Sequence, residues 1–320
     1  MTLTLRNLIT GKNSRQGLWL LPLLITLIGF VWLYLRNDQF GNSENLSNIV
    51  AKMIPLLATS IGQMLVILTG GMDLSVGSVI SLTTAILSLD APSFMLIPAV
   101  FAAAALVGLV NGIAITRFRV VPIIATLSTM MIVLGVTRLI RPVAGGEVPQ
   151  VIVHLVTGSF SGVYMPILWL IVLVGFSLKL IHGSRFGLHL FAIGGGVMED
   201  RAYAARNFGV PDTRQIISAY VACSLFAALA GIYLAGRISS GDPNVGLNFH
   251  LDSITAVALG GTQLAGGVGS LWGTLIGSFS MTLLANGMNI ENVSAFIQTV
   301  VKGVLLMLVV ALQSRKKMGL

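Results

Sequence analysis

The residues of this sequence that could carry out chemistry are a few charged and amide side chains set within long apolar runs. Asp73 lies in a polar, glycine-rich stretch at residues 69–78. A charged group at membrane depth is costly, and is therefore a functional candidate. Asp73 or Ser75 could instead cap a helix that begins near Val76, by accepting hydrogen bonds from its free N–H groups. Both interpretations place Asp73 at a break between helices.

Four more polar side chains lie within or beside apolar runs. Gln298 and Lys302 are one helical turn apart in the last run, so they share a face. Lys302 could pair with an acidic neighbour, line a polar path or extend its amine towards a membrane interface. Asn111 and Asn286 lie in apolar runs, where an amide more often bridges two helices than contacts a ligand. With Asp73, these four residues are the candidates to line a polar path.

The motifs of common enzyme classes are missing from the sequence. It has no phosphate-binding G-x-x-x-x-G-K-[ST] loop, no H-E-x-x-H zinc motif and no G-x-S-x-G nucleophile motif. The four histidines fall in predicted loops without metal-binding spacing, and the single cysteine, Cys223, is expected to be a buried structural thiol. The sequence therefore predicts a chain that is not an enzyme, holds no metal or cofactor, and cannot hydrolyse ATP alone.

The elements that must position these residues are membrane helices. Of the 320 residues, 55% are hydrophobic and only 9% are charged. Soluble proteins have about a quarter of their residues charged. The net charge of +8 could indicate nucleic acid, but the basic residues fall at the ends of apolar runs and do not cluster with aromatics. The composition therefore indicates an integral membrane protein.

Ten apolar segments predict an all-α fold with about ten transmembrane helices. The third and eighth are short, and the eighth could be partial or re-entrant. They cover roughly residues 17–35, 49–69, 76–89, 94–116, 120–139, 164–181, 215–234, 253–264, 270–288 and 293–312. With the N-terminus inside, cytoplasmic segments collect 13 of the 19 Lys and Arg residues, which favours both termini in the cytoplasm.

The predicted organisation is a single membrane domain with two short tails. Residues 1–16 form a cytoplasmic N-terminal tail, residues 17–312 the transmembrane domain, and residues 313–320 a cytoplasmic C-terminal tail. The longest inner loop covers about residues 182–214. Helix contacts are expected at small residues, because lipid gives helices no hydrophobic reason to associate. The candidates are Gly108 with Gly112, and Gly269, Gly273 and Gly277.

Two glycine-rich breaks share the pattern G-G-x-x-L-x-x-G. Gly70, Gly71 and Gly77 form the first, and Gly260, Gly261 and Gly267 the second, in which Gly266 also lies. Paired interruptions of hydrophobic segments point towards a transport site, since backbone that leaves the helix at membrane depth must be shielded by protein or water. Two similar turns at helix ends would produce the same pattern.

At these motifs the chain resembles the permease subunits of ribose-type ABC importers, which take up monosaccharides and related small polar molecules. The resemblance runs from about Asn45 to Leu312. Its matching stretches are residues 67–78, 122–127, 185–187, 192–195, 251–262, 264–269, 273–277, 286–288 and 301–303. One departure lies at residues 194–209, where the chain is longer than usual and has Gly196, Val197 and Met198 in place of an expected Asn.

The resemblance implies a multi-pass protein of the bacterial inner membrane that works by alternating access along a translocation pathway. It implies a dimer with an identical or related permease, two ATP-binding-cassette ATPase subunits that hold ATP and Mg, and an extracytoplasmic solute-binding protein. It also implies that the inner loop around Glu199, Asp200, Arg201 and Arg206 couples the chain to the ATPase. The sequence does not identify the sugar, which is selected by the binding protein.

Two other function classes stay open at this point. In an ion-coupled secondary transporter, Asp73 or Lys302 would be the coupling residue, and no ATPase would be needed. An integral membrane enzyme is a weaker alternative, because the sequence lacks a catalytic constellation.

Overall fold

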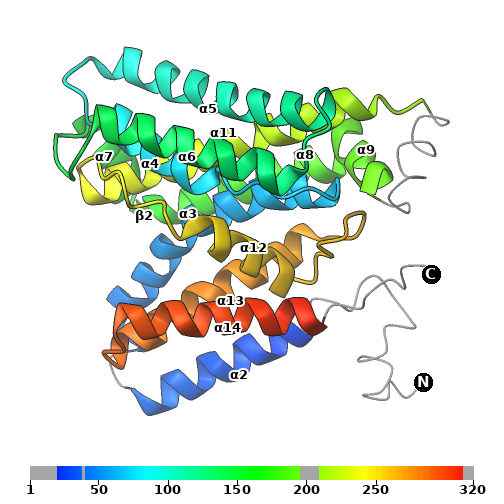
Figure 1. The fold of residues 1–320 in the computed structure, drawn as a ribbon. Helices are drawn as coiled ribbons and strands as arrows, with labels where there is room; N and C mark the ends of the chain where they lie inside the picture. Colours follow the sequence, from blue (N-terminus) through cyan, green and yellow to red (C-terminus); the bar gives the residue numbers. More distant parts are fainter. Residues whose placement is uncertain (1–19, 38–39, 195–208, 313–320) are drawn as a thin grey trace, which may run out of the picture.

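The computed structural model describes residues 20–37, 40–194 and 209–312, and these are almost entirely helical (Figure 1). The described strands are β1 (Ser159–Phe160) and β2 (Val163–Tyr164), which pair as a short antiparallel hairpin. The helices are α2 (Leu20–Arg36), α3 (Ser43–Leu68), α4 (Val76–Leu87), α5 (Ser93–Thr116), α6 (Pro122–Ile140), α7 (Gln150–Thr157), α8 (Met165–His182), α9 (Arg185–Gly194), α11 (Asp212–Ile238), α12 (Phe249–Leu259), α13 (Leu271–Ile290) and α14 (Ala295–Leu312).

Helix lengths fit a membrane protein. Five helices, α3, α5, α6, α8 and α11, are long and apolar enough to cross a membrane. The shorter apolar helices include α2, α4, α12 and α14. The α-helical class predicted from the sequence is confirmed, and each of the ten apolar segments contains or overlaps one helix.

The helices form two groups with α12 between them (Figure 1). The larger group is built around α11, which packs on α3, α4 and α5, and the smaller group contains α2, α13 and α14. Glycines allow the closest approaches: a Cβ added at Gly108 would lie 2.6 Å from the carbonyl oxygen of Tyr220, and one at Gly112 would lie 2.7 Å from Cα of Ile217. The predicted small-residue packing at Gly108 and Gly112 is therefore confirmed, with α11 as the partner helix.

The same device joins α12 to α13. A Cβ added at Gly277 would lie 1.9 Å from the carbonyl oxygen of Ala256, and one at Gly273 would lie 2.0 Å from that of Gly260. Both distances are shorter than any real carbon–oxygen contact. Backbone thus packs directly on backbone, which holds the short helix α12 against α13.

Several boundaries differ from those expected. Helix α3 begins at Ser43, six residues before the predicted start, because Asn42 caps it by accepting from the backbone N–H of Glu44. Helix α12 lies four to five residues upstream of the predicted segment. Helices α7 and α9 and the hairpin were not predicted, since they lie outside the long apolar runs. The histidines expected in loops lie on helices: His154 on α7, His182 on α8, His189 on α9 and His250 on α12.

Candidate functional site

The two glycine-rich breaks are far apart in the sequence, but they contact each other in the structure. The backbone N–H of Gly267 donates to the carbonyl oxygen of Leu68 at 3.0 Å. A Cβ added at Gly266 would lie 2.8 Å from the backbone nitrogen of Gly70. This contact, which we call the break junction, consists of backbone atoms from both sides.

The first break begins where α3 ends at Leu68. Gly70 has a φ of +85°. This is the left-handed conformation that commonly closes a helix and that costs glycine nothing. Gly71 follows against α11, and a Cβ there would lie 2.4 Å from the hydroxyl oxygen of Tyr220. The chain then starts α4 at Val76, so the break separates two helices as predicted.

Asp73 is the centre of a fully buried polar cluster in this break. Its Oδ1 accepts from the backbone N–H of Ser75 at 2.8 Å and from the hydroxyl of Ser75 at 2.6 Å. The Asn111 amide donates to the Ser75 hydroxyl at 2.9 Å and approaches Asp73 Oδ1 at 3.5 Å. Ser75 is the N-cap residue of α4, without a side-chain cap bond. Asp73 therefore stabilises the turn before α4 and does not cap the helix itself.

Gln63 on α3 holds the backbone of Asp73 from the other side. In the amide orientation that satisfies both groups, its nitrogen donates to the carbonyl oxygen of Asp73 at 3.0 Å and its oxygen accepts from the Asp73 N–H at 3.2 Å. Gln63 is fully buried, as are Asp73 and Asn111. Sequence reasoning missed Gln63, although a lone amide inside an apolar run is the same signal that singled out Asn111.

The second break is longer and contains no acidic residue. Helix α12 ends at Leu259, and α13 starts at Leu271 with the Ser270 hydroxyl as its cap. Between them the backbone bonds to itself, for example from the N–H of Gln263 to the carbonyl of Val268 at 2.9 Å. Three glycines of this loop have positive φ, namely Gly261, Gly266 and Gly267.

The two breaks are related less closely than their shared sequence pattern suggests. In the first break, the glycine with φ +85° is Gly70, the first of the two adjacent glycines. In the second break, the glycine with the matching φ of +84° is Gly261, the second of the two. Gly77 lies inside α4, where a Cβ would meet the carbonyl oxygen of Gly246 at 2.5 Å, but Gly267 lies in the loop. The conformations that end the two helices therefore match with a shift of one residue.

Helix α9 reaches the break junction. A Cβ added at Gly194, its last residue, would lie 1.9 Å from the carbonyl oxygen of Leu68 and 2.2 Å from the nitrogen of Gly267. The chain enters the predicted inner loop through this helix. Glu199, Asp200, Arg201 and Arg206, which the resemblance implies in coupling, lie outside the described residues.

The other predicted path residues lie away from the junction. Asn286 exchanges amide hydrogen bonds with Asn45 at 2.8 and 3.3 Å, so it joins α13 to the start of α3. Gln298 donates to the Asn289 side chain and the Val293 carbonyl, both at 2.9 Å, and thereby closes the turn between α13 and α14. The structure brings Asp73 and Asn111 together, and it separates both from Asn286, Gln298 and Lys302.

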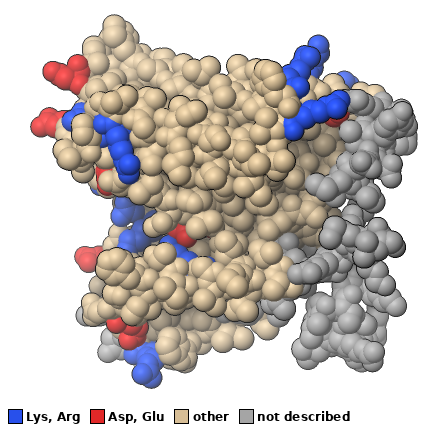
Figure 2. All heavy atoms as spheres, in the orientation of Figure 1, with Lys and Arg blue, Asp and Glu red and all other residues tan. Residues whose placement is uncertain are grey.

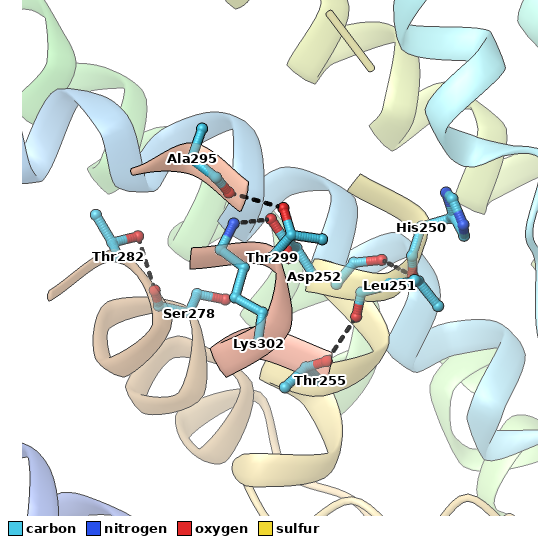
Figure 3. A network of polar contacts seen from close by, with 10 residues as sticks. His250, Leu251, Asp252, Thr255, Ser278, Thr282, Ala295, Thr299 and Lys302 are labelled. Atoms are coloured by element: carbon cyan, nitrogen blue, oxygen red, sulfur yellow. Dashed lines mark hydrogen bonds and ion pairs between the residues drawn. The ribbon is translucent and has the colours of Figure 1, made fainter. Parts of the chain in front are cut away.

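Lys302 on α14 forms an ion pair with Asp252, in the first turn of α12, at 2.7 Å between Nζ and Oδ2 (Figure 3). An acidic partner was among the options that the sequence suggested for Lys302. The side chains of Asp252 and Lys302 are 16% and 24% exposed, so the pair borders accessible space. Within the described residues no cluster of His, Cys, Asp and Glu side chains could hold a metal ion, and Cys223 is buried.

The chain has relatives among known proteins. Residues 45–310 match the family described as the permease component of the branched-chain amino acid transport system. The chain is similar to the ribose import permease protein RbsC of Escherichia coli K12, with 34% identity over 97% of this chain and 98% of the relative. It is 32% identical to RbsC of Bacillus subtilis, over 94% and 91%. No solved structure matches.

A third relative is the galactose/methyl galactoside import permease protein MglC of Escherichia coli K12. It is 31% identical, and the match covers 92% of this chain and 93% of the relative. All three matches thus cover more than nine tenths of both chains, so they compare whole permeases and not isolated motifs.

Proposed function

We propose that this chain carries a monosaccharide across the bacterial inner membrane by alternating access. The chain belongs to the permease family just described and is a transmembrane permease subunit of an ABC sugar importer. Its relatives are named as import permeases, so it is a transport subunit and not an enzyme. The observation that carries the proposal is the break junction, where both helix interruptions and the end of α9 meet in backbone contact.

The proposed cargo is a pentose or hexose. The family description names branched-chain amino acids, whereas the relatives that match this chain nearly from end to end are named for ribose and for galactose or methyl galactoside. Matches over more than nine tenths of both chains support the sugar. A branched-chain amino acid is the second candidate, and the family description favours it.

The mechanism follows from how the junction is packed. When the partner ATPases close on ATP, they move the inner loop and with it α9. Gly194 leaves no room for a side chain against Leu68 and Gly267, so a displacement of α9 acts directly on the break junction. The first break is held in the larger helix group by Gln63 and Asn111. The second break is a loop closed by hydrogen bonds of its own backbone, and we assign the movement to it, together with α12.

The remaining parts of the importer are supplied by partner chains. We propose two permease subunits with one pathway between them, two ATPase subunits that hold ATP and Mg, and a solute-binding protein outside the membrane. Helix α9 then faces the cytoplasm, and α7 with the β1–β2 hairpin faces outwards, since they lie at opposite ends of the helices (Figure 1). Ten spans with both termini inside are the proposed topology, and the distribution of basic residues supports it.

The test is uptake by proteoliposomes that contain this chain with its ATPase and binding protein. We expect ATP-dependent entry of radiolabelled ribose or galactose, and no entry of leucine above the level without ATP. Uptake of leucine but of neither sugar would mean that the cargo is a branched-chain amino acid. Sugar entry driven by an imposed proton or sodium gradient without ATP would contradict the importer mechanism.

A further inference from the structure

A cavity of about 120 Å³ lies among α3, α12, α13 and α14, well apart from the buried Asp73 cluster. Its lining includes Lys52, Phe249, Asp252, Thr282 and Lys302. Figure 2 shows a hollow between the larger and the smaller helix group in which basic and acidic side chains gather. Elsewhere on this face, charged side chains lie at the two ends of the helices and the middle is uncharged.

The cavity carries an excess of positive charge. Lys302 and Asp252 neutralise each other, with 2.7 Å between Nζ and Oδ2. Lys52 is exposed, and no carboxylate in the described parts of the chain pairs with it. Two ammonium groups can donate hydrogen bonds here, and the Asp252 carboxylate retains lone pairs that can accept them. Charged donors and acceptors that share one cavity at membrane depth are expensive, which indicates a function.

The position of the cavity relates it to the proposed movement. Lys302 lies seven residues after the start of α14 and Lys52 nine residues after the start of α3. At the rise per residue of an α-helix, both lie roughly 12 Å from these helix ends. Asp252 belongs to α12, whose far end leads into the second break. A molecule bound here would therefore contact α12, a short helix that leads from the cavity to the second break.

The chemistry of the lining fits a polyhydroxylated molecule. Neighbouring sugar hydroxyls can donate to Asp252 while they accept from Lys302 and Lys52, and the ring of Phe249 offers an apolar surface to a C–H face. Leu56 and Met281 form the rest of an apolar wall. The cavity is too small to enclose a monosaccharide, but it has room for a few hydroxyl groups.

We propose that this cavity is a sugar subsite of the permease, in which Lys52, Asp252 and Lys302 bind hydroxyl groups and Phe249 packs on the ring. This inference rests on the proposed function and names the part of the pathway that contacts the cargo. Affinity is weak, because few contacts are made and the site opens to solvent. A second copy of the chain would bring a second subsite.

The test measures binding directly, by saturation-transfer NMR of ribose and galactose with the permease–ATPase complex in nanodiscs, without binding protein. The informative variants are Lys52→Met and Phe249→Leu, because neither removes a member of the ion pair. The matched controls are Lys179→Met on α8 and Phe94→Leu on α5, both exposed and outside the cavity lining. Each variant is first shown to assemble with the ATPase as the wild type does.

We expect saturable transfer to the sugar C–H protons at millimolar concentration in the wild type and both controls, and a loss of at least about threefold in each cavity variant. Equal signals in all five proteins would overturn the subsite. So would displacement of the signal by inorganic phosphate but not by a second sugar, which would identify an anion site. If the wild type takes up neither sugar with ATP, the proposed function itself fails, which is a separate result.

Discussion

The two glycine-rich breaks contact each other, yet they are held in different ways. The first is fixed by buried side chains, since Gln63 forms hydrogen bonds with the backbone of Asp73 and Asn111 donates one to the hydroxyl of Ser75. The second is a loop of backbone hydrogen bonds and positive-φ glycines, and its helix α12 is tied to α14 by a partly exposed ion pair. Similar sequence patterns thus produce one interruption fixed by buried side chains and one closed by its own backbone, and the proposed mechanism assigns the movement to the second.

The largest expected effect comes from the point where both breaks meet α9. Gly194→Ala would place a methyl group 1.9 Å from the carbonyl oxygen of Leu68, a backbone atom that cannot rotate away. We expect loss of folded protein, or a cost of more than about 3 kcal/mol from overpacking. Gly175→Ala on α8, where a Cβ meets nothing within 4 Å, is the matched control. Fluorescence-detected size-exclusion chromatography compares the two. Equal folded yields would mean that the junction opens easily.

The next prediction distinguishes the role of the hydrogen bonds of the Asp73 side chain from the role of its charge. Asp73→Ala removes the acceptor of two Ser75 hydrogen bonds in a fully buried site. Such a loss costs about 3 kcal/mol. Asp73→Asn keeps an oxygen for both bonds, so we expect a smaller loss of thermal stability and continued ATP-dependent uptake.

The Asp73→Asn result also distinguishes the importer from an ion-coupled transporter. An Asn side chain cannot take up and release a proton. If uptake by Asp73→Asn is abolished while its thermal midpoint equals that of the wild type, the carboxylate has a coupling role and the first break is more than a fixed support.

In the second break, Gly266→Ala tests backbone conformation. Gly266 has φ +88°, and a Cβ there would lie 2.8 Å from the nitrogen of Gly70. A left-handed backbone costs an L-residue about 1 kcal/mol or somewhat more. We expect the folded complex to form with reduced uptake, because the ground state is strained and the junction can no longer close fully. Wild-type uptake at unchanged ATP hydrolysis would show that this contact does not transmit movement.

The smallest effect is expected far from the junction. Asn286→Ala removes the reciprocal amide pair with Asn45. Interhelical hydrogen bonds of this kind contribute about 1 kcal/mol in membranes. We predict a slightly lower thermal midpoint and normal uptake. A specific loss of uptake with unchanged stability would identify Asn286 as a residue of the path.

Much of the fold could be predicted from the sequence, because long apolar runs leave little choice but helices in a membrane. Each predicted run overlaps a helix, and the glycines at 108 and 112 mark the contact with α11. Local signals did not reveal which polar groups meet. Asp252 and Lys302 are 50 residues apart, and Leu68, Gly194 and Gly267 come from three separate segments. Only tertiary packing brings such residues together.

The measurement that tests the central claim most directly is the distance between helices during the ATP cycle, by double electron–electron resonance on labelled cysteines. Cys223 is buried, so labels can be directed to exposed positions by Phe94→Cys on α5, Leu139→Cys on α6 and Phe296→Cys on α14. Labelled protomers are diluted with unlabelled ones. We predict that ATP binding leaves the α5–α6 distance unchanged and shifts the α5–α14 distance. Two unchanged distances, or equal shifts in both, would contradict a fixed first break and a moving second one.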